Sequence, residues 1–150
     1  MDRKEDIRNF ENFIGSMRNF KMFYDHGVRG FSDIDTIYEK HGNFVILEGK
    51  TVYGSILRIP YGQALLLKNL VDKLQEPSVC YLIGIKDVSY STKHYYLVNM
   101  KDVFIKGKDT RDRKDQRVLE FKLENTEGPM NEQVFCEKIK KQCDYLENLF

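Results

Sequence analysis

Apolar residues near the start of the chain recur at steps of three and four, which is the spacing of one face of an α-helix. Arg, Asn and Glu fill the positions between them, and Gly27 and Gly30 end the pattern. The spacing predicts a helix over residues 2–22, with an apolar face made by Ile7, Phe10, Phe13, Ile14, Met17 and Phe20.

Two runs typical of β-strands come next, over residues 31–39 and 43–52. The separator Lys-His-Gly-Asn has turn chemistry, because Gly42 and Asn43 tolerate positive φ. The sequence therefore predicts a β-hairpin. A two-residue turn at His41-Gly42 would pair positions whose numbers sum to 83.

The next segment changes to helical spacing and then to a strand. Pro60 suits the first turn of a helix, and residues 61–75 carry leucines at helical steps. The run over residues 79–86 is short and almost wholly apolar, which is typical of a buried central strand. We expect Pro77 to end the helix before this strand begins.

The C-terminal half contains two further strand patterns, over residues 95–100 and 118–123, and a charged segment between them. We expect residues 101–117 to form a loop or an extended edge. Residues 131–150 form an amphipathic pattern with Asn131 as the N-cap, and its apolar face would comprise Phe135, Cys136, Ile139, Cys143 and Leu146.

This order of elements predicts a single α/β domain over residues 1–150, with a central mixed β-sheet flanked by α-helices. The 150 residues are 41% hydrophobic and 31% charged, which suits an ordinary globular protein. The formal net charge of +1 excludes a protein that coats nucleic acid through bulk attraction. No apolar run is long enough to cross a membrane, so we expect no membrane partner.

Three cysteines and three histidines show no zinc-binding spacing. The cysteines are Cys80, Cys136 and Cys143, and they suit reduced core residues of a cytoplasmic protein. The charged N-terminus lacks the apolar stretch of a signal peptide, which agrees with a cytoplasmic location.

The predicted hairpin carries the candidate chemistry. Side chains alternate along a strand, so Asp33 and Asp35 share one face of their strand, and Glu48 and Lys50 share one face of theirs. The register places Asp35 opposite Glu48, and Asp33 opposite Lys50. Opposed carboxylates repel each other, and a hard cation such as Mg²⁺ removes that repulsion. Lys50 would then orient a water molecule or stabilise a phosphorus centre that gains negative charge.

A plainer interpretation is a solvated acidic face, with Lys50 as an ordinary cross-strand partner of Asp33. The apolar run Phe44–Leu47 favours a site, because charges at the end of a buried strand are poorly explained by solvation. Gln63 lies on the core-facing stripe of the following helix, where its amide needs a partner. It either bonds a backbone group or reaches the end of the Glu48 strand.

An Asp on one strand, Glu-x-Lys on the next and Gly-Gln at the start of a leucine-rich helix resemble the PD-(D/E)xK nuclease superfamily. The resemblance spans Gly30–Leu74, and it is greatest to the Holliday-junction-resolvase-like and virus-type replication-repair branches, many of them in phages. It implies a restriction-endonuclease-like fold. It also implies metal ligands at Asp33 or Asp35 and at Glu48, with Lys50 and Gln63 completing the catalytic set.

Two features of the motif depart from that family or leave its assignment open. Ser32 stands where the family often has proline, and the Asp33-Ile34-Asp35 doublet leaves the primary ligand ambiguous. Some members also place a Glu in the first helix, for which Glu11 is the candidate.

The resemblance implies an endodeoxyribonuclease that hydrolyses phosphodiester bonds with Mg²⁺ or Mn²⁺. Its DNA substrate would be branched, in recombination, repair or replication, and such resolvases usually act as homodimers. The alternatives are a non-catalytic module that keeps the fold and binds nucleic acid or protein, and an unrelated α/β domain with a solvated acidic hairpin.

The charged segment supplies candidate phosphate contacts at Lys106, Lys108, Arg111, Arg113, Lys114 and Arg117. The interspersed Asp109, Asp112 and Asp115 favour a solvated loop over phosphate contacts. Three strand tyrosines either stack on unpaired bases or pack within the fold, namely Tyr90, Tyr95 and Tyr96.

Overall fold

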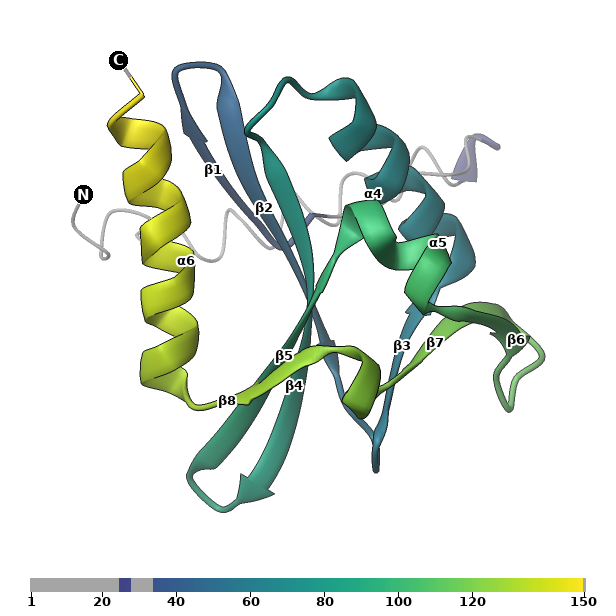
Figure 1. Cartoon of the computed structure of the whole chain (residues 1–150). Helices are drawn as coiled ribbons and strands as arrows, with labels where there is room; N and C mark the ends of the chain where they lie inside the picture. Colours follow the sequence, from purple (N-terminus) through teal and green to yellow (C-terminus); the bar gives the residue numbers. More distant parts are fainter. Residues whose placement is uncertain (1–24, 28–33, 150) are drawn as a thin grey trace. The chain divides into compact units, whose positions relative to one another are not determined.

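The computed structural model describes residues 25–27 and 34–149. The predicted helix over residues 2–22 and the candidate residues Glu11 and Asp33 lie outside the described residues. The fold considered below is the compact unit Ile34–Phe150 (Figure 1). Its strands and α-helices are β1 Thr36–Lys40, β2 Asn43–Thr51, β3 Ile56–Pro60, α4 Tyr61–Lys73, β4 Val79–Ser89, β5 Thr92–Asn99, α5 Val103–Lys106, β6 Lys108–Arg111, β7 Arg117–Lys122, β8 Glu127–Met130 and α6 Glu132–Glu147.

A five-stranded mixed sheet in the order β1-β2-β4-β5-β8 forms the centre of this unit. Strands β2 and β4 pair in parallel, and the other neighbours pair antiparallel. Helix α6 runs along one side of the sheet and α4 along the other (Figure 1). The α/β class with a central mixed sheet and flanking helices is therefore confirmed.

The β1–β2 hairpin has the predicted register. Thr36 pairs with Leu47 and Lys40 with Asn43, so the paired numbers sum to 83. The turn residues His41 and Gly42 have φ values of 55° and 79°. Positive φ at both central positions is the geometry whose twist matches two antiparallel strands. The predicted two-residue turn at His41-Gly42 is confirmed; of the two residues named for positive φ, Gly42 adopts it, whereas Asn43 is the first residue of β2 and does not.

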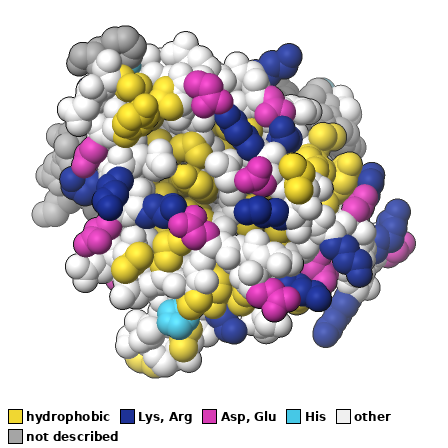
Figure 2. Space-filling view, viewed as in Figure 1, with side chains coloured by type: hydrophobic (Ala, Val, Ile, Leu, Met, Phe, Trp, Pro, Cys, Tyr) yellow, Lys and Arg dark blue, Asp and Glu magenta, His cyan; other side chains and the backbone are white. Residues whose placement is uncertain are grey.

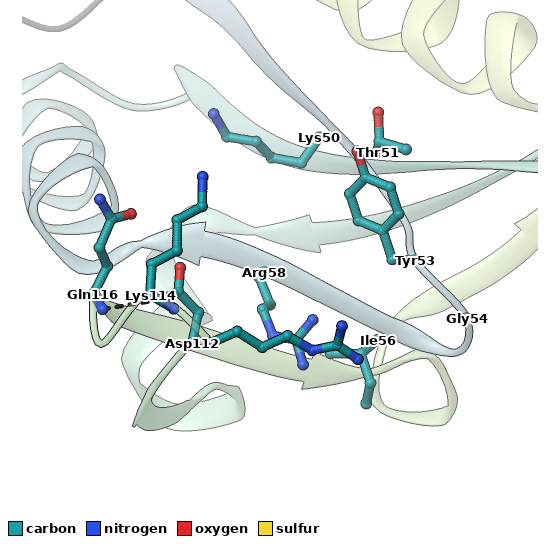
Figure 3. Close-up of a pocket in the computed structure, with 10 residues that line it drawn as sticks. Lys50, Thr51, Tyr53, Gly54, Ile56, Arg58, Asp112, Lys114 and Gln116 are labelled. Carbon is teal, nitrogen blue, oxygen red and sulfur yellow. Dashed lines mark hydrogen bonds between the residues drawn. The ribbon is translucent and has the colours of Figure 1, made fainter.

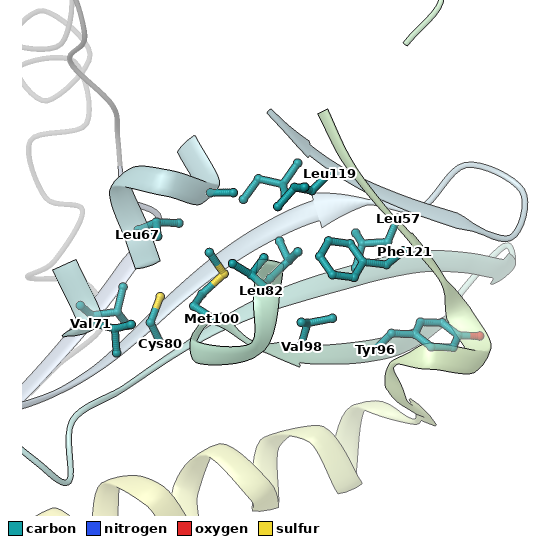
Figure 4. Packing of buried hydrophobic residues seen from close by; sticks show 14 of the residues in the cluster. Leu57, Leu67, Val71, Cys80, Leu82, Tyr96, Val98, Met100, Leu119 and Phe121 are labelled. Carbon is teal, nitrogen blue, oxygen red and sulfur yellow. The ribbon is translucent and has the colours of Figure 1, made fainter. Parts of the chain in front are cut away.

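Strand β4 is buried on both faces, which explains its apolar run. Cys80 and Leu82 point into a cluster with α4, β3, β5 and β7, whereas Tyr81 and Ile83 pack on the α6 side. This alternation gives the unit two apolar cores separated by one sheet. Figure 4 shows the α4-side core, which contains Leu67 of α4 and Leu82 of β4.

The prediction of a loop or extended edge over residues 101–117 is wrong for residues 101–106, which are helical, whereas residues 108–111 form an edge strand and residues 112–116 a turn. The segment contains a 3₁₀ turn, Met100–Asp102, followed by α5 and β6. Met100 and Val103 are fully buried and fix the start of the segment to the core. Strand β6 then pairs with β7 in a second sheet of order β3-β7-β6.

Helix α6 begins as predicted, because the Asn131 side chain accepts a hydrogen bond from the Val134 backbone N–H at 2.8 Å. The expectation that Cys136 lies on the apolar face is wrong, since its side chain is exposed. Phe135 and Ile139 lie on the face of the helix that packs on the sheet. Cys136 directly follows Phe135, so its side chain points away from that face. No helix in the described ranges is long and apolar enough to span a membrane.

Candidate functional site

Glu48 is a buried carboxylate in the central sheet, with 2% of its surface exposed. Its Oε1 atom accepts a hydrogen bond from Gln63 Nε2 at 2.8 Å and lies 3.1 Å from Lys50 Nζ. Its Oε2 atom is also buried and has no hydrogen-bond partner among the described residues. Buried polar atoms without a partner are uncommon and are expensive to maintain, so Oε2 marks this position as a candidate site.

The fold explains how these three residues meet. Alternation along β2 points Glu48 and Lys50 to the same side of the sheet as Ile46, the side that α4 covers. Helix α4 starts directly after β3, and Ala64 and Leu67 pack it on the core. Gln63 lies in the first turn of that helix. The structure thus favours the side-chain partner for Gln63 over a backbone partner.

Asp35 lies just before β1, where continuation of the register places it opposite Glu48. It is exposed, and its Oδ2 accepts a hydrogen bond from the Gly49 backbone N–H at 2.7 Å. This bond holds the Asp35 carboxylate beside the strand that carries Glu48. Asp33, the other candidate of the doublet, lies outside the described residues.

The donor set fits a hard cation only in part. Carboxylate oxygens are the protein ligands that Mg²⁺ prefers, and Glu48 Oε2 and Asp35 are the available ones. Within residues 25–27 and 34–149, no group of three His, Cys, Asp or Glu side chains is placed to hold a metal ion. Cys80 adds no ligand of this class, since burial and the nearby charge of Glu48 raise the pKa of its thiol to about 12.

A groove of about 830 Å³ opens beside this carboxylate site. Lys50 lines it at the end of β2, and Tyr53 and Arg58 line it from the β2–β3 turn and β3. The β6–β7 turn forms the opposite wall with Arg113 and Lys114. Figure 3 shows Lys50 and Lys114 extending into the space between the two walls. Lys50 therefore belongs to both the carboxylate site and the groove.

The predicted basic residues divide into two groups. Arg113 and Lys114 line the groove, whereas Lys106 ends α5 and Lys108 and Arg111 belong to β6, away from the groove lining. Figure 2 shows Lys and Arg side chains gathered at the right of the view, over the β6–β7 hairpin, with Asp and Glu among them.

Arg117 is held within the fold by two contacts. It forms a two-point ion pair with Asp109, with a shortest distance of 2.6 Å, and this pair lowers the pKa of the Asp109 carboxyl. Its guanidinium also lies 3.6 Å from the centre of the Tyr61 ring. These contacts assign Arg117 a role in joining β6, β7 and α4.

The tyrosines singled out by the sequence do not line the groove. Tyr90 is fully exposed in the β4–β5 turn, Tyr95 stacks on Phe135 with ring centres 4.5 Å apart, and Tyr96 is buried. Two groove residues were not predicted from the sequence, namely Tyr53, which is 73% exposed, and Arg58. The signal that could have found Tyr53 is an aromatic residue next to Gly54, directly after the Glu-x-Lys strand.

Comparison with known proteins adds no relative: no family model matches the chain, and no curated protein has significant sequence similarity to it.

Proposed function

We propose that this chain is a metal-dependent endodeoxyribonuclease with a restriction-endonuclease-like fold. The observation that carries the proposal is the Glu48 carboxylate, which is buried, held at one oxygen by Lys50 and Gln63, and unpartnered at the other among the described residues. An unpaired buried oxygen beside a lysine destabilises a fold, and such arrangements are typical of functional sites.

The proposed roles follow from these contacts. Gln63 holds Glu48 in one rotamer through its 2.8 Å hydrogen bond, so that Oε2 stays free for a ligand. The Lys50 side chain is 28% exposed, and its ammonium group supplies positive charge where an attacked phosphodiester becomes more negative. The adjoining groove lets a strand approach Lys50 from solvent.

Glu48 would hold Mg²⁺ or Mn²⁺ together with Asp35 or Asp33, and the bound ion would supply a water of lowered pKa and positive charge at the phosphate. Asp35 would serve through its carboxylate beside Gly49. Substitution of Asp33 and of Asp35 by Asn, separately, would identify the primary ligand.

The test is a cleavage panel of branched and linear DNAs with Mg²⁺ and Mn²⁺. Glu48→Ala, Glu48→Gln and Lys50→Ala are expected to lose cleavage by at least about 100-fold, the scale of a lost electrostatic or acid–base group. Glu120→Gln is the matched control, because Glu120 lies on β7 in an ordinary ion pair with Arg58. Wild-type rates for Glu48→Gln would refute the proposal.

Metal binding gives a second measurement that does not depend on cleavage. Mn²⁺ at 100 times its dissociation constant stabilises a single-site protein by about 2.7 kcal/mol. We expect this increase in the wild type and not in Glu48→Gln. A non-catalytic module would show neither the increase nor the cleavage. Size-exclusion chromatography with light scattering would test the proposed homodimer.

A further inference from the structure

The groove beside Glu48 combines positive charge with an exposed aromatic ring. Its cationic side chains are Lys50, Arg58, Arg113 and Lys114, and Asp112 is its acidic one. Tyr53 lies in the same lining, in the turn between β2 and β3, with 73% of its surface exposed. A large aromatic side chain left this exposed next to cations is the composition of a nucleic-acid surface.

Two of the four cations are available for a ligand. Lys50 lies next to Glu48, and Arg58 donates a hydrogen bond to Glu120 Oε2 at 3.0 Å. Arg113 and Lys114 form no ion pair with any residue of the described ranges, and both are exposed. Phosphate oxygens would therefore meet these two side chains first.

Asp112, the acidic residue of the groove, stabilises the β6–β7 turn that carries Arg113 and Lys114. Asp112 Oδ1 accepts hydrogen bonds from the backbone N–H groups of Lys114 and Gln116, each at 2.9 Å. The turn is closed by the Asp112 N–H bond to the Gln116 carbonyl, also 2.9 Å. The Asp112 carboxylate is thus hydrogen-bonded to the backbone of its own turn, and this turn places Arg113 and Lys114 in the groove lining.

The tyrosine distinguishes between single and paired strands. A base in a duplex has both faces covered by its neighbours in the stack, whereas an unpaired base offers a face to an aromatic side chain. Tyr53 is in the same groove as the free cations, so one strand could place phosphates on the cations and a base on the ring.

We propose that this groove binds an unpaired DNA strand, with its phosphates on Arg113 and Lys114 and a base stacked on Tyr53. The inference deepens the proposed nuclease function and rests on it for one point only: the strand leads to a scissile phosphate at Glu48 and Lys50. The substrate class is then DNA with a single-stranded segment next to the cleaved bond, such as a fork, a flap or a splayed junction.

The experiment measures binding of the full chain in EDTA by fluorescence anisotropy, so that no cleavage contributes. The probes are a labelled oligothymidylate, a fully paired duplex of equal length and a fork with one single-stranded arm. Base stacking on an aromatic residue predicts that Tyr53→Ala weakens oligothymidylate binding by about 5- to 150-fold. Tyr53→Phe keeps the ring and should bind within about 2-fold of wild type.

The salt dependence of binding tests the role of Arg113 and Lys114 separately. Each phosphate contact contributes about 0.7 to the slope of log affinity against log salt for single strands, so Arg113→Ala/Lys114→Ala should lower the slope by about 1.4. Lys106→Ala/Lys108→Ala removes the same charge outside the groove and should leave the slope unchanged. Circular dichroism checks that each variant is folded, which is expected because all four positions are exposed.

The outcomes separate this inference from the nuclease proposal. Tight oligothymidylate and fork binding that depends on Tyr53, without any metal-dependent cleavage, would support the groove and refute the nuclease. Cleavage that is lost in Glu48→Gln but unchanged in Tyr53→Ala, with unchanged single-strand affinity, would refute the groove. Duplex bound as tightly as oligothymidylate, or no oligothymidylate binding, would also overturn it.

Discussion

Glu48→Gln is expected to make the protein more stable in metal-free buffer while it removes cleavage. Glutamine has the shape of glutamate, and its carbonyl oxygen would accept the hydrogen bond that Gln63 now donates to Oε1 and would still lie beside the Lys50 ammonium group. Its amide group would take the place of Oε2, which has no partner among the described residues. The substitution therefore changes the charge and little else.

The magnitude follows from two opposing terms. Burial of a carboxylate costs several kcal/mol, here about 4 kcal/mol, because only 2% of Glu48 is exposed. The hydrogen bond from Gln63 becomes a neutral one and the Lys50 ammonium group loses its negative partner, and these two changes lose about 2–3 kcal/mol in total. The net gain in the free energy of unfolding is about 1–2 kcal/mol. For a chain of 150 residues, this gain raises Tm by about 2–8 °C.

The assay is urea and thermal unfolding in EDTA for a double-mutant cycle. Lys50→Met leaves the buried carboxylate without its counter-charge and should destabilise the protein by about 1–3 kcal/mol, less than for a fully buried pair because Lys50 is 28% exposed. Glu48→Gln/Lys50→Met should recover most of that loss. Glu120→Gln, the matched control, should change stability by less than about 1 kcal/mol.

A Glu48→Gln protein that is less stable than wild type by more than about 1 kcal/mol would contradict this prediction. It would mean that the Glu48 carboxylate stabilises the fold, as an ordinary structural ion pair would. The same result would remove the observation on which the proposed function depends.

Three further predictions concern the fold around the site. Gly84→Ala should lower the free energy of unfolding by about 1–3 kcal/mol, because the alanine Cβ would lie 2.8 Å from Val52 Cγ2 and 3.2 Å from Leu57 Cδ2. An unchanged midpoint of urea unfolding would show that the segment around Val52 and Leu57 rearranges at little cost. Asn131→Ala removes the cap of α6 and should cost about 1 kcal/mol, whereas Asn131→Asp should be near neutral. Tyr38 donates a hydrogen bond to Glu147, which raises the pKa of its phenol to about 12 from an unfolded value of 10.0. The contribution of this hydrogen bond to stability is thus fully present below pH 10 and is lost as pH rises toward 12. In a spectroscopic titration of the tyrosines, Tyr38→Phe should lack the ionisation near pH 12, and a Tyr38 that ionises near pH 10 would contradict the prediction.

Local features of the chain were predictable because short-range chemistry determines them. The two-residue turn at His41 and Gly42 sets the hairpin register, and that register predicts Asp35 opposite Glu48. The Asn131 cap and the helix that carries Gln63 also depend on neighbouring residues alone. The contact between Gln63 and Glu48 was one of two alternatives, and only the packed α4 helix separates them.

The groove was not predictable in this way, because it depends on long-range strand pairing. Arg58 pairs with Glu120 across β3 and β7, and that pairing brings the β6–β7 turn next to the β2–β3 turn, which is distant in the sequence. The charged composition of residues 101–117 indicated a loop, since polar residues outnumber apolar ones there. Burial of Met100 and Val103 and the pairing of β6 with β7 fix this segment to the rest of the unit.

The β6–β7 turn has a consequence for protein engineering. Residues 112–116 are held by Asp112, by hydrogen bonds within the turn and by the Arg111 bond to the Asp115 carbonyl, whereas Glu48 belongs to the central sheet. In the proposed function, the cleavage residues and the strand-binding residues would therefore lie in different parts of the sequence and meet at Lys50. Substitution of Arg113 and Lys114 within an intact Asp112 turn would then change the proposed strand binding without any change to β2.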